Sequence, residues 1–472
     1  MLTSAGDTER LEDLWWSGIR LWYNEGADGG LHEAMQTWQQ AIDSVEWVDE
    51  SIIGQEEEGI NNHVLPDSDC SQEASFLAPL LLFLGGCYLD ATDTRSAQIL
   101  LRRCLSTPYF RNKLMTAGNG DENNNFAFSA ISEYVSSFEE DLRNKGEPWK
   151  IGFQIAEWAI EERKKCSASF SDSATSFPPL WSDPYHRPGY MYTPLASKAA
   201  FGRPEHPDWC RKLEEHFPVI LDEYQYLISN GEYRHKTSCN NQQQMPQHWP
   251  CVGGGDHRDG AGAHDDSVLR GGDWREIVLF GSGARPHLAP KTCAIIQKLA
   301  PEAVHLAQQG AGEIIFSVLA PHTYIAPHCA SSNVRLTAHL GLQVPLDKEN
   351  CYIQVADEKL HWEEGKIIVF DDSYQHEVHN KTDKIRAVLL LRFWHCNIPL
   401  EDRQKALQYI FDAKDYDQLK RCNPPLPPNG SRNARGMEQS LCPTCGRTGF
   451  QSIRLVYLED QLFACVCGQE VR

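Results

Sequence analysis

The sequence is short of positive charge. Its 472 residues include 44 lysines and arginines against 65 aspartates and glutamates, so the formal net charge is −21. A surface this acidic repels nucleic-acid phosphates and anionic lipid headgroups. We therefore expect neither nucleic acid nor a membrane as a general partner, although this composition still permits a local basic pocket for a small dianion.

Long apolar runs are also lacking. The most apolar stretch, Phe76 to Leu84, is too short to span a bilayer and contains Pro79. The sequence after Met1 shows no basic segment followed by an apolar core, so no secretory signal is expected and a cytoplasmic protein is predicted. In such a chain the 16 cysteines are expected to be thiols or metal ligands rather than a disulfide framework.

Residues 1–165 are predicted to be helical, with small residues recurring where paired helices would touch. The two matching sets are Leu14, Gly18, Leu21, Ala34, Trp38 and Ala41, and then Leu81, Gly85, Tyr88, Ala97, Leu101 and Cys104. The second set has tetratricopeptide spacing, and the first fits with four extra residues in the turn. A plain helical bundle with close packing is the alternative. Since this region has no catalytic constellation, we expect it to serve recognition or scaffolding.

The next part of the chain is predicted to be a β domain, residues 178–400, after a linker at 166–185 and with a polar insertion at 238–272. From Trp274 onward, β-branched or apolar runs alternate with turn residues. The expected strands are Ile314 to Leu319, Val334 to Leu342, Tyr352 to Val355, Lys366 to Phe370 and Ile385 to Phe393. Short strands at this spacing, without helices between them, indicate a sandwich or jelly roll.

Two histidines and an arginine stand at strand ends in this domain. His328 ends one strand, His376 follows another, and Arg386 opens the next. If residues 380–384 close a hairpin, His376 and Arg386 face each other across neighbouring strands. Two imidazoles suit a ferrous ion, and an arginine fork suits the far carboxylate of a dianion that chelates it. Alternatively, Arg386 pairs with a nearby aspartate.

Several motifs in register resemble the aspartyl/asparaginyl β-hydroxylase family. They are Trp274-Arg275, Ala289-Pro290-Lys291-Thr292-Cys293, Pro327-His328, Arg335 with His339-Leu340-Gly341-Leu342, Trp362-Glu363-Glu364-Gly365-Lys366, and Phe370-Asp371-Asp372-Ser373 through His376-Glu377-Val378. The resemblance implies a double-stranded β-helix that uses Fe(II), 2-oxoglutarate and O₂ to hydroxylate a β-carbon.

Carried over by motif, the resemblance also implies roles for single residues. His328 and His376 would bind iron. Arg386 and Ser317 would bind the distal carboxylate of 2-oxoglutarate, and His339 would lie at its other end.

Two positions bear on activity. Most iron oxygenases have a carboxylate ligand two residues after the first histidine, and this chain has Ala330 there. The family also lacks that carboxylate, and so do iron halogenases. The family usually has an arginine two residues before His339, where this chain has the neutral Thr337. Arg335 is nearby, but we expect it on the opposite face of the strand.

The C-terminal residues 440–472 carry a separate signal. Cys442 and Cys445 are followed by Cys465 and Cys467, each pair beside a glycine, with a strand-like segment between them. This spacing resembles a zinc ribbon with a shortened second pair, and free thiols are the alternative.

The sequence thus predicts a 2-oxoglutarate-dependent dioxygenase whose substrate is an aspartyl or asparaginyl side chain of a peptide or protein. Its partners would be that substrate and a protein bound by the helical repeats. Two alternatives stay open: a non-catalytic scaffold with a degenerate oxygenase fold, favoured by Thr337, and an oxygenase or halogenase of small molecules.

Overall fold

The computed structural model describes most of the chain with gaps. The described residues are 5–24, 30–45, 72–116, 125–138, 148–167, 183–192, 195, 206–230, 246, 249–252, 268–419, 424–425, 427, 453–454, 463–465 and 470–471. They belong to two compact units, Met1–Leu180 with Asp412–Arg472, and Trp181–Phe411. None of the described helices is long and apolar enough to cross a membrane.

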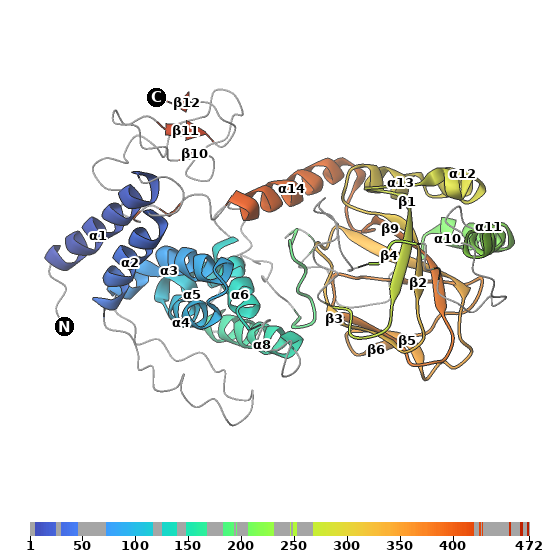
Figure 1. Ribbon diagram of the computed structural model, residues 1–472, viewed down its shortest axis with the longest axis horizontal. Coiled ribbons are helices and arrows are strands. Elements are labelled where there is room, and N and C mark those ends of the chain that lie inside the picture. The colour runs from blue at the N-terminus through green and yellow to red at the C-terminus, as the bar shows by residue number, and fades with distance from the viewer. Residues whose placement is uncertain are drawn as a thin grey trace. The chain divides into compact units, whose positions relative to one another are not determined.

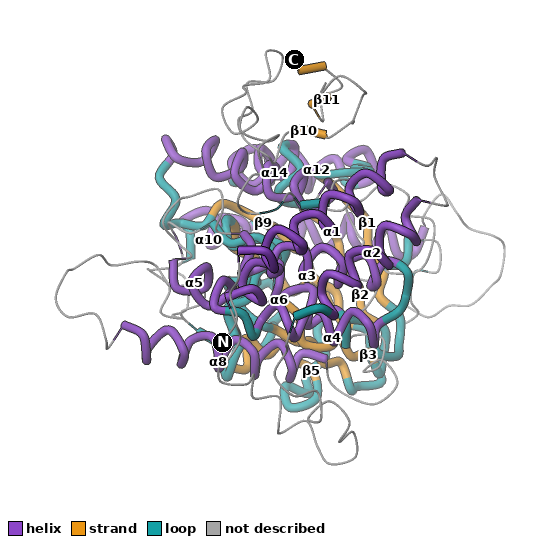
Figure 2. The backbone as a smooth tube through the Cα atoms, turned by 90° about the vertical axis from the view of Figure 1, so that its left-hand side faces the viewer, coloured by secondary structure: helices purple, strands orange, loops and turns teal. Residues whose placement is uncertain are grey.

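The first unit is built of paired helices (Figures 1 and 2). Its helices are α1 (Ala5–Asn24), α2 (Gly30–Asp43), α3 (Gln72–Asp90), α4 (Thr94–Leu105), α5 (Pro108–Thr116), α6 (Asn125–Ser136) and α8 (Pro148–Ser167). Helix α1 packs on α2, and α3 packs on α4. The predicted helical region is confirmed in these described residues.

The two helix pairs make the same close contact. A methyl group at Gly18 would approach Trp38 Nε1 to 2.1 Å, and one at Gly85 would approach Leu101 Cγ to 2.6 Å. Trp38 and Leu101 hold matching positions in the two predicted sets. Glycine is required at both crossings because a side chain would push the helices apart. The tetratricopeptide assignment itself stays a prediction.

The second unit contains two antiparallel sheets that face each other. The larger has the strand order β1-β2-β9-β4-β7, and the smaller has the order β3-β8-β5-β6. Its strands are β1 (Trp274–Phe280), β2 (Ile314–Leu319), β3 (Thr323–His328), β4 (Arg335–Gln343), β5 (Cys351–Val355), β6 (Glu358–Leu360), β7 (Ile367–Phe370), β8 (His376–Asn380) and β9 (Arg386–Trp394). Apart from the β5–β6 hairpin, strands β2 to β9 alternate between the two sheets in jelly-roll order, which confirms the predicted architecture.

Helices cover the outer face of the larger sheet (Figure 1). They are α10 (Asp208–Glu215), α11 (Phe217–Asn230), α12 (Pro290–Leu299) and α13 (Pro301–Gln308). Their apolar side chains share one core with Phe316, Leu340 and Leu389 of the sheet. No helix lies between the five expected strands, all of which are described; α12 and α13 precede them, between β1 and β2. They shield a sheet face that would otherwise expose apolar side chains to water.

The turn at 380–384 does not close a hairpin, so that expectation is wrong. Strand β8 pairs with β3 and β5 in one sheet, whereas β9 pairs with β2 and β4 in the other. The Asn380 side chain donates to the carbonyl oxygens of Ala320 and Lys384 at 2.8 Å each. These bonds hold a corner at which the chain passes from sheet to sheet.

The C-terminal part of the chain is described at only a few positions. Strands β10 (Ile453–Arg454), β11 (Phe463–Cys465) and β12 (Glu470–Val471) form a small antiparallel sheet, and Cys465 ends β11. Cys442, Cys445 and Cys467 lie outside the described residues, as do most of the predicted linker and the loop 253–267 within the predicted insertion. Their predicted roles stay predictions.

Candidate active site

The two candidate iron ligands lie side by side on the smaller sheet. His328 of β3 and His376 of β8 are register partners across neighbouring strands. Their ring centroids are 4.2 Å apart with an interplanar angle of 51°. The hairpin expectation placed Arg386 opposite His376, but His328 is the residue that lies there.

Both imidazoles are fixed in the same way by the backbone. His328 Nδ1 lies 2.8 Å from the carbonyl oxygen of Ala326, and His376 Nδ1 lies 2.9 Å from that of Tyr374. A carbonyl oxygen only accepts, so each Nδ1 carries the proton and each Nε2 keeps a lone pair. Burial, followed by the charge of His328, lowers the pKa of His376 to about 3. The neutral ring that a metal needs is therefore the stable form of His376.

Arg386 is a buried cation with unused donors. The residue is 2% exposed, and its Nε and Nη1 atoms have no hydrogen-bond partner among the residues that the structure describes. Its guanidinium carbon lies 4.6 Å from the ring centroid of Trp362, and burial lowers its pKa to about 10. It still carries its charge at neutral pH. The pairing with a nearby aspartate is not seen among the described residues, since Asp372 lies beside Arg335 and Arg392 and Asp371 lies beside His395. Unsatisfied buried donors of this kind are costly unless an anion binds them.

His339 presents a neutral N–H donor on β4. Its Nδ1 accepts a hydrogen bond from Trp362 Nε1 at 3.2 Å, so the proton of the neutral ring is on Nε2. That Nε2 is buried without a partner in the described part of the chain. Burial first, and then the charge of Arg386, hold the pKa of His339 well below its ordinary value. A neutral donor here suits a carboxylate or carbonyl oxygen.

Ser317 lies on the same sheet, on strand β2 next to β9. It is 3% exposed, and its hydroxyl oxygen accepts a hydrogen bond from Trp274 Nε1 at 3.0 Å. Ser317 pairs with Val388, two residues from Arg386, so Ser317 and Arg386 lie on the same face of neighbouring strands. Because Trp274 occupies an acceptor position of the hydroxyl, the serine proton is free to be directed at an anion beside Arg386.

The structure also places Ala330, the residue that stands where most iron oxygenases have a carboxylate ligand. It is 7% exposed, and its N–H donates to the carbonyl oxygen of Asp372 at 2.7 Å. Among the described residues, no third histidine, cysteine or carboxylate forms a metal-binding cluster with the two histidines. The expectation that Arg335 faces away from Thr337 is wrong. Residues two apart on a strand share a face, and Arg335 Nε lies 3.8 Å from Asp372 Oδ2 on the inner side of β4.

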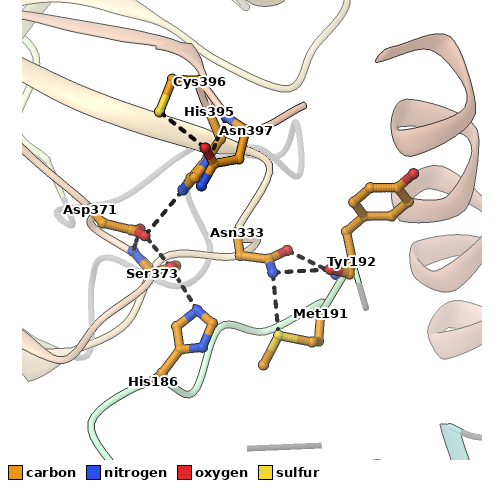
Figure 3. A network of polar contacts seen from close by, with 9 residues as sticks. All are labelled: His186, Met191, Tyr192, Asn333, Asp371, Ser373, His395, Cys396 and Asn397. Atoms are coloured by element: carbon orange, nitrogen blue, oxygen red, sulfur yellow. Dashed lines mark hydrogen bonds and ion pairs between the residues drawn. The ribbon is translucent and has the colours of Figure 1, made fainter. Parts of the chain in front are cut away.

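Sequence reasoning missed a polar network beside the site (Figure 3). His186 Nε2 lies 3.0 Å from Ser373 Oγ, which donates to Asp371 Oδ1, while His395 Nε2 lies 3.7 Å from Asp371 Oδ2. The segment containing His186 also pairs with the chain after His328, through a 3.0 Å bond from the Gly189 N–H to the Ala330 carbonyl. The Asp371-Asp372-Ser373 motif is the part of this network that the sequence shows. His186 and His395 come from distant segments of the chain, so no local pattern links them to Asp371.

Comparison with known proteins agrees with this geometry. Residues 214–396 of this chain, which are less than half of its length, match the family model described as Aspartyl/Asparaginyl beta-hydroxylase. It is 36% identical to the Aspartyl/asparaginyl beta-hydroxylase of Homo sapiens over 30% of this chain and 18% of that protein. It is 35% identical to the Ornithine lipid ester-linked acyl 2-hydroxylase of Rhizobium tropici over 25% of this chain and 41% of that protein.

A longer match is found with the Aspartate beta-hydroxylase domain-containing protein 2 of Homo sapiens, at 27% identity over 48% of this chain and 55% of that protein. The chain therefore spans about half or less of the length of these three relatives. Among solved structures, a 2OG-Fe(II) oxygenase family protein from Burkholderia pseudomallei is 14% identical with a TM-score of 0.21, covering 26% of this chain and 65% of that one.

Proposed function

We propose that this protein is an Fe(II)- and 2-oxoglutarate-dependent dioxygenase that hydroxylates its substrate. The observation that carries the proposal is the His328–His376 pair, with both Nδ1 atoms held by carbonyls and both Nε2 atoms left to bind a metal. Two imidazoles of fixed tautomer suit a ferrous ion. The match to the hydroxylase family model supports the same conclusion.

The remaining site residues fit a dicarboxylate. Arg386 and Ser317 would hold the distal carboxylate, through the guanidinium donors and the hydroxyl, and His339 Nε2–H would donate to the other end. When bound, iron and 2-oxoglutarate supply the oxidising chemistry that inserts one oxygen atom of O₂ into a substrate C–H bond and releases succinate and CO₂. The protein fixes the tautomers of His376 and His339 and keeps both rings neutral.

We further propose an aspartyl or asparaginyl side chain of a peptide or protein as the substrate. The names of the human relatives point to that class, whereas the name of the Rhizobium tropici relative points to an acyl chain. The three names have hydroxylase in common and differ in the substrate that they name. A small-molecule substrate is the alternative.

The metal assignment is tested by iron content. His328→Ala and His376→Ala should each abolish ferrous binding and succinate release from 2-oxoglutarate. His322→Ala is the matched control, because His322 is exposed and pairs with Asp383 at 2.9 Å, away from the site. Equal iron content in all three variants would remove the site assignment.

The scaffold alternative, favoured by Thr337, makes the opposite prediction. It requires no turnover, no succinate release in the absence of substrate, and no 2-oxoglutarate binding by calorimetry with Mn(II) in place of Fe(II). Binding at micromolar concentration would exclude it.

A further inference from the structure

The inner face of the larger sheet carries a second arginine beside the site. Arg392 lies on β9 directly opposite Thr337 of β4, as its register partner. Side chains of such partners stand about 4.5–5.5 Å apart at Cβ. Thr337 is short and neutral, so it leaves room for the long side chain of Arg392 on the face that also carries His339, one pleat further along β4.

Arg392 lies close to the proposed cosubstrate donor. Thr337, its register partner, is two residues from His339 on the same face of β4, and Leu390, two residues before Arg392, is the register partner of His339. Arg386, by contrast, lies six residues earlier on β9, about 20 Å away along an extended strand. Its guanidinium packs on Trp362, the residue that bonds His339. The two arginines therefore approach His339 from opposite directions.

Two carboxylates hold Arg392 in place. Its Nη1 donates to Glu313 Oε1, and its Nε lies 3.5 Å from Asp372 Oδ2. Asp372 is buried and also lies 3.8 Å from Arg335 Nε. Burial acts to raise the pKa of Asp372, but the two guanidinium charges act against it, and the pKa stays below its ordinary value. Fixing a guanidinium in this way orients it before an anion arrives, which reduces the entropic cost of binding.

We propose that Arg392 is a second anion-binding residue of the site, which interacts with the 2-oxo acid end of the cosubstrate while Arg386 holds the distal carboxylate. This inference rests on the proposed function. Arg335 is the less suitable cation, because it stands opposite Trp394, one pleat further from His339, and its Nη1 donates to the Ala311 carbonyl at 3.2 Å. The ligand class that fits is a dicarboxylate with anionic groups at both ends.

The test measures 2-oxoglutarate affinity by calorimetry on full-length protein with Mn(II) in place of Fe(II). Arg392→Gln should weaken binding roughly ten- to hundredfold, because charge-assisted bonds are about twice as strong as neutral ones. Arg403→Gln is the matched control, since Arg403 pairs with Glu302 at 2.8 Å outside the site. It should leave the dissociation constant unchanged.

Moving the positive charge from residue 392 to residue 337 separates an effect on 2-oxoglutarate binding from an effect on folding. Thr337→Arg alone should weaken binding or leave it unchanged, because the new guanidinium faces Arg392. The double variant Thr337→Arg with Arg392→Thr should recover most of the affinity lost in Arg392→Thr, since the cation returns on the neighbouring strand.

The outcomes distinguish the two proposals. If wild type binds 2-oxoglutarate and Arg392→Gln binds equally well, with only its melting temperature lowered, Arg392 is a structural ion-pair residue and this inference is overturned. Tighter binding by Thr337→Arg alone would also overturn it. If wild type does not bind 2-oxoglutarate, the proposed function fails, and this inference fails with it.

Discussion

At the scale of single residues, hydrogen bonds to one ring nitrogen decide what the other nitrogen does. Carbonyl acceptors on the Nδ1 atoms of His328 and His376 leave both Nε2 atoms as acceptors, whereas Trp362 makes His339 a donor. The same reasoning applies in the neighbouring network. Ser373 donates to Asp371, so it accepts from His186 Nε2–H.

Asp371 is the titrating member of that network. Burial is the main cause that raises its pKa from 3.8 to about 7, while hydrogen bonds from Ser373 act in the opposite direction. Burial also lowers the pKa of His186 and of His395 to about 4. At mildly acidic pH all three groups are therefore neutral inside the protein.

This gives a pH prediction for stability. A carboxyl whose pKa is higher in the folded state contributes stability that is complete below pH 3.8 and is lost as pH rises towards 7. Asp371→Asn, which cannot ionise, should abolish this loss. The difference in melting temperature, variant minus wild type, should increase between pH 4.5 and pH 7.5. The corresponding difference in the free energy of unfolding should increase by at most about 1.4 kcal/mol per pH unit. Parallel melting-temperature profiles would contradict the raised pKa.

At the scale of elements, one close backbone approach brings Trp362 to His339. A methyl group on Gly341 would lie 2.3 Å from the carbonyl oxygen of Glu363, and Gly341 forms an isolated bridge with Glu364. The segment 362–366 therefore lies against β4 only because residue 341 has no side chain. The Gly in His-Leu-Gly-Leu thus has a packing reason that periodicity does not reveal.

Gly341→Ala should consequently disturb both stability and ligand binding. We expect a loss of about 1–3 kcal/mol from overpacking, and weaker 2-oxoglutarate binding because Trp362 moves away from His339. Gly310→Ala serves as the control: its φ is +74° but a methyl group there meets no atom within 4 Å. It should lower the melting temperature through backbone strain alone, with unchanged affinity. Unchanged affinity in Gly341→Ala would show that the Trp362 contact does not matter for binding.

A buried carboxylate fixes another motif at this scale. Glu223 of α11 accepts hydrogen bonds from the backbone N–H groups of Lys291 and Thr292 and from the Thr292 hydroxyl, at 2.7–2.9 Å. These are donors of the first turn of α12, which has no side-chain cap of its own. The Ala-Pro-Lys-Thr-Cys motif therefore anchors a helix behind the sheet rather than contributing to the site.

At the scale of the whole molecule, the site residues all come from the second unit, and the helical pairs and the C-terminal strands belong to the first. For the four C-terminal cysteines, Cys442, Cys445, Cys465 and Cys467, we propose a structural zinc site. If they bind zinc, folding of residues from about 440 onward depends on the metal.

The protein should then contain one tightly bound zinc per chain, measured by elemental analysis. Cys442→Ser should lose it, and a chelator should unfold this tail. Cys396→Ser is the control, since Cys396 is an exposed thiol of the second unit. A metal-free tail that keeps its order would identify these cysteines as ordinary thiols.

Much of the second unit follows from local pattern. The five predicted strands agree with β2, β4, β5, β7 and β9 within one residue at each end, because apolar runs between turn residues are strong strand signals. His328, His376, Ser317, His339 and Arg386 were all found by motif. Their identity as ligands stays a prediction, but their burial and partners are compatible with it.

What the sequence by itself determined is the set of strands, the residue types at their ends and the likeness to the hydroxylase family, since these depend on neighbours along the chain. Only the tertiary structure decided which residues face each other. A turn of five residues, such as 380–384, is equally compatible with a hairpin and with a corner between sheets. Whether β8 pairs with β3 or with β9 therefore depends on long-range packing. For that reason His376 lies against His328 rather than Arg386, and Arg392, which no motif singled out, lies opposite Thr337.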